Sequence, residues 1–571
     1  MTEQQFSPRR RRRRRGGLNW LLFILALVIT CVVGYIKLVP SFEQQEIAYS
    51  YKHPIYFNGE LQQHGAFIQD GHIKLPLPVL EERLENSPIY YEEETNTLVL
   101  TTMDKVLRFK TESLNALLNE KSYELSITAQ VENDIVYIPA ELIEQLYGLH
   151  IEQMNDVIAV YDAEFSVDTA LVSRKQGTAL RTEPNIKSPY YRELEQQEQL
   201  LVWEQGEGWS KVQTTSGTIG YVKSDHIQLG EAIVYTPNTE KYEGLEHDLS
   251  GERINLTWEA IYNRQPNLSS MPAMEGVNVV SPTWFELVDG EGKIQGKATH
   301  EYMEWAHKRG YQVWALFSNG FEPDRTTEVL SSTEKRFFMI QQLVAFAELY
   351  QLDGINIDFE NVYTEDKENL VQFVKEMMPI MHEQGLVVSI DVTPKSNSEM
   401  WSVFLDREAL GKHVDYMMVM AYDEHWAASP KAGSVASLPW VEQSIKRILE
   451  EDQVAPEKLI LGVPLYTRVW SEETQADGSV KVSSKAIGMS RAKEIIEEQE
   501  LTPVLDEASG QHYVEYMEDG IKQRIWLEDE HSIAGRVDLV HKYNLAGIAT
   551  WQRTFADNEI WSVMDRELNR Q

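Results

Sequence analysis

The stretch that decides the fold reads Asp353-Gly354-Ile355-Asn356-Ile357-Asp358-Phe359-Glu360. Polar and apolar side chains alternate along it, as they do in a β-strand, where successive side chains point to opposite faces. Asn356, Asp358 and Glu360 would share one face of that strand. Two carboxyl groups held close together and away from water raise the pKa of at least one of them. The stretch therefore predicts a strand that ends in a general acid.

Apolar runs of the same kind recur on both sides of this strand. Eight can be marked within residues 236–571, with amphipathic helical stretches between several of them: 253–258, 277–282, 312–317, 354–359, 387–392, 416–421, 459–463 and 546–551. Strands buried on both faces read as continuous apolar runs. Eight strand–helix units predict a (β/α)8 barrel with insertions. An open doubly wound sheet is the alternative, but no Gly-x-Gly-x-x-Gly motif follows the first run.

The motif at the fourth run resembles that of glycoside hydrolase family 18. The family pattern is Asp-x-x-Asp-x-Asp-x-Glu, and here Asp353, Asn356, Asp358 and Glu360 occupy its four positions. Residues 236–571 are most similar to the bacterial branch of spore-cortex and germination-type N-acetylglucosaminidases. The resemblance implies a retaining, substrate-assisted hydrolase that needs no metal or cofactor. Its substrate would be a polymer that contains N-acetylglucosamine, either peptidoglycan or a chitin-like glycan.

The same resemblance implies roles for single residues. Glu360 would protonate the glycosidic oxygen, and Asp358 would hold the N–H of the substrate's 2-acetamido group. The sixth run continues as Met-Ala-Tyr-Asp at 420–423 and is similar to the family's Met-x-Tyr-Asp pattern. Tyr422 would therefore hold the acetamido oxygen as a third catalytic residue. Met420, Asp423 and the motif's first residue, Asp353, are expected to bind substrate.

Asn356 departs from the family motif, which has an aspartate at this position. An asparagine can donate a hydrogen bond, but it cannot relay a proton. We therefore expect Asn356 to bind substrate and to alter the pH profile of the activity without abolishing it.

Tryptophans at the ends of strands are candidates for stacking on sugar rings. Apolar faces of sugars pack on aromatic rings, and the family places a tryptophan at the end of its eighth strand, where this chain has Trp551. Trp284 and Trp470 end other predicted strands and are candidates for further subsites.

The N-terminus predicts a membrane anchor. Arg9 to Arg15 are consecutive arginines, and no charged residue follows until Lys37. Residues 1–17 would be a cytoplasmic tail and 18–38 a single transmembrane helix, with the catalytic domain extracytoplasmic at the cell wall. A cleaved signal peptide is the alternative. The lone cysteine, Cys31, excludes an intrachain disulfide.

The charge of the chain argues against nucleic acid as a partner. The formal net charge is −36, and residues 1–39 carry +7, which leaves −43 on the remainder. A field of this sign repels phosphate backbones.

Two smaller modules are predicted before the barrel. Residues 52–163 resemble the α+β module named after the N-terminal region of copper amine oxidase, because 75–82 and 137–144 each read as a strand, a proline and a helix start. Residues 166–230 resemble a bacterial Src-homology-3-like small β-barrel, on the strength of a Trp-x-Lys-Val and a Gly-Tyr-Val pattern. In the simplest interpretation, Trp209 and Tyr221 of these patterns are core residues.

Two other functions compete with hydrolysis. The chain could be a non-catalytic, lectin-like protein that binds cell-wall glycan, although such relatives lack the acid at the position of Glu360. It could also be a wall-anchored scaffold whose function depends on residues 41–230 and not on catalysis by the barrel.

Overall fold

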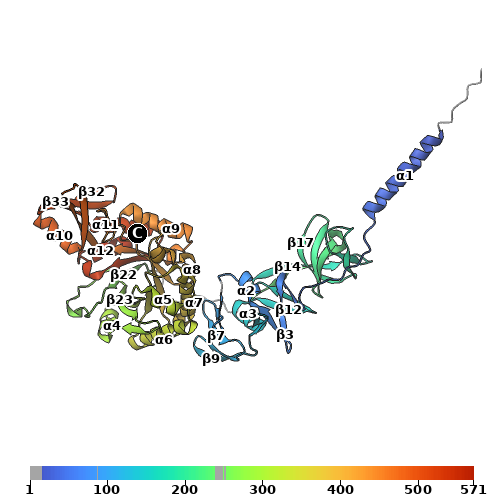
Figure 1. Cartoon of the computed structure of the whole chain (residues 1–571), viewed down its shortest axis with the longest axis horizontal. Coiled ribbons are helices and arrows are strands. Elements are labelled where there is room, and N and C mark those ends of the chain that lie inside the picture. The colour runs from blue at the N-terminus through green and yellow to red at the C-terminus, as the bar shows by residue number, and fades with distance from the viewer. Residues whose placement is uncertain (1–15, 87, 238–248, 250–251, 571) are drawn as a thin grey trace, which may run out of the picture. The chain divides into compact units, whose positions relative to one another are not determined.

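The computed structural model describes residues 16–86, 88–237, 249 and 252–570. The chain divides into two compact units. The first comprises residues 1–82 and 129–239, and the second comprises residues 83–128 and 240–571 (Figure 1).

The second unit contains a closed barrel of eight parallel strands. They are β22 (Ile254–Glu259), β23 (Val279–Leu287), β25 (Gln312–Ser318), β26 (Gly354–Asp358), β27 (Val387–Val392), β28 (Tyr416–Val419), β29 (Leu459–Pro464) and β35 (Gly547–Trp551). Each strand pairs with its neighbour in sequence order, and β22 closes the barrel by pairing with both β23 and β35. The short β24 (Ile294–Gly296) adds to β23 in the antiparallel direction. The predicted (β/α)8 barrel is confirmed.

Helices cover the outside of the barrel (Figure 1). They are α4 (His300–His307), α5 (Pro323–Leu330), α6 (Thr333–Tyr350), α7 (Lys367–Glu383), α8 (Arg407–His413), α9 (Leu438–Glu451), α11 (Glu530–Lys542) and α12 (Ile560–Leu568). The apolar face of β26 packs under this layer, as its alternation predicts, since Ile355, Ile357 and Phe359 are all buried in the core there. Phe359 stacks on Phe373 of α7 with ring centroids 6.0 Å apart.

A second apolar cluster fills the inside of the barrel. It includes Trp258 of β22, Trp314 of β25 and Met418 of β28, all essentially without solvent exposure. The inside of the barrel is therefore a packed core.

An insertion separates β29 from α11. It forms a five-stranded antiparallel sheet with the order β31-β30-β34-β33-β32 and one helix. Its elements are β30 (Tyr466–Thr474), β31 (Val480–Gly488), α10 (Met489–Glu498), β32 (Val504–Asp506), β33 (Gln511–Glu518) and β34 (Ile521–Trp526).

Another five-stranded sheet packs on helices α6 and α7 of the barrel. Its strands are β5 (Ile89–Glu92), β6 (Thr97–Thr101), β7 (Val106–Lys110), β8 (Asn115–Leu118) and β9 (Lys121–Glu124). Glu92 Oε1 accepts a hydrogen bond from the first amide of α6, Thr333 N–H, at 2.7 Å. Arg108 of β7 lies over the Phe337 ring at 4.1 Å. This sheet is thus an integral part of the barrel's unit, although the sequence predicted one module over 52–163.

The rest of that module lies in the first unit. It has two four-stranded sheets, with orders β12-β13-β1-β2 and β10-β11-β4-β3. The elements are β1 (Pro54–Phe57), β2 (Glu60–Gly65), β3 (Phe67–Gln69), β4 (His72–Pro76), α2 (Leu77–Arg83), β10 (Gln130–Glu132), β11 (Ile135–Pro139), α3 (Ala140–Tyr147), β12 (His150–Met154) and β13 (Val157–Tyr161). The two similar segments each form a strand that ends at a proline, followed at once by a helix, and β4 pairs with β11.

The region predicted as a small β-barrel is an antiparallel β structure with its own core. Its strands are β14 (Phe165–Val172), β15 (Thr178–Arg181), β16 (Tyr190–Leu194), β17 (Gln199–Gln205), β18 (Trp209–Thr214), β19 (Ile219–Lys223) and β20 (Ile227–Leu229), and β21 (Ile233–Tyr235) pairs with β14. Apolar side chains such as Val172, Leu180 and Val212 fill its interior.

The predicted membrane anchor is wrong. Helix α1 spans Gly16–Leu38, yet none of the helices in the described part of the chain has the length and apolar character needed to cross a bilayer. The prediction of a single-pass protein with a membrane partner rested on the arginine cluster and the uncharged run that follows it. The arginine-rich segment before residue 16 lies outside the described residues.

Candidate active site

A cavity of about 1330 Å³ opens at the carboxyl ends of the barrel strands. Most of the residues singled out in the sequence line it: Asp358, Glu360, Met420, Tyr422, Asp423 and Trp551. They come from the ends of β26, β28 and β35 and the loops that follow. The carboxyl ends of parallel strands meet at one edge of a barrel, which is why segments far apart in sequence converge there.

Three of the carboxyl groups that line this cavity have raised pKa values. Burial raises the pKa of Asp358 to about 7. Burial, together with the negative charges of Asp358 and Asp423, holds the pKa of Glu360 well above its usual range. Burial and the charge of Asp358 likewise hold the pKa of Asp391 well above its usual range. Near neutral pH the site therefore contains both a protonated acid and a carboxyl group that ionises readily, the pair needed for general acid catalysis.

Asp391 was missed by the sequence reasoning. It lies in β27, is 3% exposed and lines the cavity beside Asp358 and Glu360. The signal was present, because Asp391 is the one charged residue in the apolar run 387–392.

Asn356 lies below the cavity and does not line it. Its side chain has no solvent exposure and donates through Nδ2 to Asp391 Oδ1 at 3.0 Å. Its Oδ1 accepts from Trp258 Nε1 at 2.9 Å and from Ser281 Oγ at 3.1 Å. The prediction that Asn356 binds substrate gains no support from this position, because both its amide oxygen and its amide nitrogen form hydrogen bonds to protein groups.

Asp353 lies at the opposite end of β26 from Glu360 and does not line the cavity. Its Oδ2 accepts from Val313 N–H at 2.7 Å and contacts His307 Nε2 at 2.9 Å. Since strands rise about 3.3 Å per residue, a position seven residues before Glu360 lies far from the cavity. These contacts tie the start of β26 to the neighbouring strand and to α4.

A hydrogen bond and an ion pair join the loop after β28 to the inserted sheet. Tyr466 Oη donates to Asp423 Oδ1 at 2.6 Å, and Arg468 Nη2 pairs with the same oxygen at 3.2 Å. The Tyr422 and Tyr466 rings meet edge to face with centroids 6.4 Å apart. Burial and then the charge of Asp391 hold the pKa of Tyr422 well above its usual range, so Tyr422 presents a neutral hydroxyl group. The insertion thus forms one wall of the cavity and orients Asp423.

Aromatic side chains line the cavity and its mouth. Trp551 lines it, and its ring lies 6.0 Å from the Trp258 ring. Trp401, which is 44% exposed, and Trp426, which is 54% exposed, also line it and were not singled out in the sequence. Exposed aromatic rings in a cavity suit a ligand with apolar faces, such as a sugar.

Trp284 and Trp470 are core residues and do not line the cavity. Each is 1% exposed. Trp284 packs edge to face on Tyr302 with ring centroids 5.2 Å apart. Trp470 belongs to the inserted sheet and donates to the Gly433 carbonyl at 2.8 Å.

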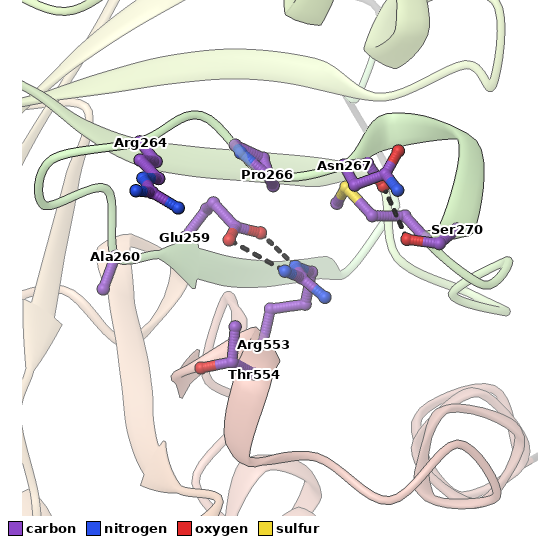
Figure 2. Close-up of a pocket in the computed structure, with 9 residues that line it drawn as sticks. Glu259, Ala260, Arg264, Pro266, Asn267, Ser270, Arg553 and Thr554 are labelled. Atoms are coloured by element: carbon purple, nitrogen blue, oxygen red, sulfur yellow. Dashed lines mark hydrogen bonds and ion pairs between the residues drawn. The ribbon is translucent and has the colours of Figure 1, made fainter.

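A smaller pocket of about 280 Å³ adjoins the cavity, and Ala260 lines both. Figure 2 shows Glu259, from the end of β22, paired with Arg553, which follows β35. One of the two contacts joins Arg553 Nη2 to Glu259 Oε1 at 2.9 Å. Because β22 and β35 are the first and last barrel strands, this ion pair secures the closure of the barrel beside the cavity.

Two parts of the chain match known protein families. Residues 283–556 match the family described as glycosyl hydrolases family 18, and residues 56–161 match the copper amine oxidase N-terminal domain. The first match spans the barrel from β23 to β35 and includes every residue that the motif placed in the cavity.

Several curated relatives and a solved structure are similar to this chain. The chain is 27% identical over 300 residues to the Bacillus subtilis glycosylase YvbX, covering 50% of this chain and 84% of that one. It is 24% identical over 255 residues to the cortical fragment-lytic enzyme of Bacillus anthracis, covering 43% and 57%. A chitinase structure from Chromobacterium violaceum ATCC 12472 has the same fold, with a TM-score of 0.50, 22% identity and coverage of 56% and 100%.

The chain spans only 57% of the length of the cortical fragment-lytic enzyme that it matches. Residues 283–556, which match the family model, include Glu360. Over residues 283–556 the barrel is therefore similar to glycosyl hydrolases family 18, and the chain is a glycoside hydrolase.

Proposed function

We propose that this protein cleaves glycans that contain N-acetylglucosamine, with retention of configuration and with participation of the substrate's own 2-acetamido group. Glu360 protonates the glycosidic oxygen, and the acetamido carbonyl oxygen attacks the anomeric carbon. This step forms an oxazolinium ion and expels the leaving group. Glu360 then takes a proton from water, which opens the oxazolinium ion and restores the sugar.

The observation that carries the proposal is the pair Asp358 and Glu360 in one cavity with different proton affinities. Burial raises the pKa of Asp358 to about 7, and the pKa of Glu360 lies well above its usual range because of burial and its acidic neighbours. As the pH rises, Asp358 loses its proton before Glu360 does. A protonated Glu360 then lies next to an ionised Asp358. The acid is needed at the leaving group, and the anion stabilises the positive charge of the oxazolinium ion.

Tyr422 and Trp551 complete the proposed site. The neutral hydroxyl of Tyr422 donates to the acetamido oxygen and directs it toward the anomeric carbon. Trp551 supports the apolar face of the reacting sugar. Met420 and Asp423 line the same cavity and confine the sugar between them.

Peptidoglycan is the proposed substrate class, with a chitin-like glycan as the second candidate. Support comes from the relatives, which include cortical fragment-lytic enzymes of Bacillus species, as well as a di-N-acetylchitobiase. The antiparallel region 166–230, which resembles a bacterial Src-homology-3-like domain, would serve to bind cell-wall glycan or peptide.

A matched pair of substrates tests the mechanism. Chitin oligosaccharides and their fully N-deacetylated counterparts have the same linkage and differ only at the acetamido group. We expect cleavage of the acetylated oligosaccharide alone, with the β-anomer as the first product in proton NMR spectra taken during the reaction. Cleavage of both, or an α-anomeric first product, would rule out acetamido participation. Purified peptidoglycan digested in parallel ranks the two substrate classes.

A further inference from the structure

The orientation of the Asn356 side chain is fixed by its neighbours. An indole N–H can only donate a hydrogen bond, so the Asn356 atom that faces Trp258 Nε1 at 2.9 Å must be the carbonyl oxygen. The NH2 group must then face Asp391 Oδ1, 3.0 Å away. Asparagine therefore presents a donor to Asp391, whereas an aspartate at this position would present a carboxyl oxygen.

The surroundings of Asp391 favour its neutral form. The side chain is 3% exposed, and the titratable groups that act on it are the carboxyl groups of Asp358 and Glu360 and the hydroxyl of Tyr422. None of these is a cation, and ionisation of a buried carboxyl group without a cation is costly.

Asp358 has an oxygen that lacks a hydrogen-bond donor. Its Oδ1 is shielded from solvent and has no hydrogen-bond partner among the described residues. An ionised carboxylate with a buried, unpaired oxygen is destabilised, because that oxygen has lost its contact with water and gained no hydrogen-bond donor. A protonated carboxyl group lining the same cavity can supply the missing donor.

We infer that Asp391 is a positioning residue that remains protonated and donates a hydrogen bond to Oδ1 of Asp358, while its other oxygen accepts from Asn356. A carboxyl group at position 391 on β27 thereby lies beside Asp358 in place of the one that the family motif has at position 356 on β26. No bond forms or breaks in this step, and the proton stays on Asp391. The inference rests on the proposed function only for its kinetic test.

Two variants of Asp391 distinguish a neutral donor from a carboxylate. Asp391→Asn keeps an acceptor for Asn356 and a donor for Asp358, so it imitates the protonated acid. We expect it to lose less than about tenfold in kcat, the effect of roughly one weakened hydrogen bond. The acidic limb of its pH profile should coincide with that of the wild type. Asp391→Leu has the same size but no polar group, and we expect it to lose about 10²–10³-fold in kcat with little change in KM.

A rescue and a spectroscopic measurement complete the test. Adding Asn356→Asp to Asp391→Leu returns a carboxyl group to the motif position and should recover activity. In infrared difference spectra at pH 7, the band of a protonated carboxyl group should be weaker in Asp391→Asn than in wild type. Melting temperatures of all variants show whether a loss of activity is a loss of folding.

The opposite results would overturn the inference. If Asp391 acts as an anion, Asp391→Asn loses as much activity as Asp391→Leu and its acidic limb moves to lower pH, because a negative neighbour of Asp358 has been removed. An unchanged infrared band would also contradict it. If wild type cleaves no glycan, the proposed function fails, and the infrared result alone still decides the protonation state of Asp391.

Discussion

Asn319 holds the backbone of Glu360 from both sides. Its Oδ1 accepts a hydrogen bond from Glu360 N–H at 3.1 Å, and its Nδ2 donates to the Glu360 carbonyl oxygen at 2.8 Å. Asn319 follows β25, has no solvent exposure and also donates to Thr326 Oγ1 at 3.0 Å. The acid is therefore positioned by a buried side chain from the neighbouring strand.

Asn319→Ala should misplace the acid without removing it. We expect kcat to fall by about 10²-fold with a smaller change in KM, because small displacements of a reacting group are costly. Steady-state kinetics on a chitin oligosaccharide measures this. Met564→Ala in α12 serves as a control that weakens the core away from the cavity. If both variants lose the same activity at a temperature where both are folded, Asn319 has no positioning role.

The pH dependence of activity should follow the two carboxyl groups. Asp358 must be ionised, so activity falls as the pH drops through about 7, the value to which burial raises the pKa of Asp358. Glu360 must be protonated, so activity also falls as the pH rises through its own raised pKa. The kcat profile should be bell-shaped, with its maximum above pH 7. A maximum near pH 5 would contradict this assignment.

The folding stability of the protein should also depend on the ionisation of Asp358. The folded state holds a proton on Asp358 up to about pH 7, whereas the unfolded chain releases it near about pH 4, so this group's contribution to stability is lost as the pH rises between these values. Asp358→Asn should therefore melt at a higher temperature than wild type at pH 8 and show a smaller difference at pH 4. Equal differences at both pH values would indicate that Asp358 has an ordinary pKa in the folded protein.

Trp401 should contribute to binding of longer substrates. It is 44% exposed in the cavity and its ring lies 6.2 Å from that of Phe321. Trp401→Ala should raise KM by about three- to tenfold for long oligosaccharides, the effect of one lost aromatic contact. Phe338→Ala is the matched control, because Phe338 is 45% exposed on α6 and does not line the cavity. Equal effects in the two variants would argue against a sugar-binding role.

The ion pair between Arg336 and Glu376 should be important for the stability of the barrel. Both side chains have no exposure, with Arg336 Nη2 and Glu376 Oε1 2.7 Å apart, and the guanidinium also lies over the Tyr90 ring of β5. Glu376→Ala leaves a buried cation unpaired and should lower the unfolding free energy by about 3–5 kcal/mol. Glu408→Ala breaks an exposed ion pair with Lys412 and should change the unfolding free energy by under about 1 kcal/mol. Urea denaturation measures the unfolding free energy of both variants. If both lose a similar, small amount, Arg336 has found another partner in the Glu376→Ala variant.

The sequence predicted the barrel well because each of its strands lies in a run rich in apolar residues. It also predicted that Asp358 and Glu360 lie on the same face of the fourth strand, because the alternation of side chains between the two faces of a strand depends on local sequence alone. Asp391 and Asn319 were missed because their importance depends on contacts between neighbouring strands. Asp353 was assigned from a motif position, but it lies at the amino end of β26, where no strand of the barrel contributes to the cavity.

Residues around the barrel were harder to predict for related reasons. Trp470 belongs to an inserted sheet that the strand pattern did not separate from the barrel, and its indole is used in a core hydrogen bond. The sheet of residues 89–124 packs on α6 and α7, and nothing in its own sequence indicates a surface for helices.

The central claim is that Glu360 is the acid of a glycosidase that acts on N-acetylglucosamine-containing glycan. The most direct measurement compares the full chain with its Glu360→Gln variant on peptidoglycan and on chitin oligosaccharides, with products identified by mass spectrometry. Glutamine has the same shape and no proton to give, so the account predicts new reducing ends from wild type and a loss of about 10²–10⁴-fold in the variant. Equal product release by the two proteins, with both folded, would contradict the account.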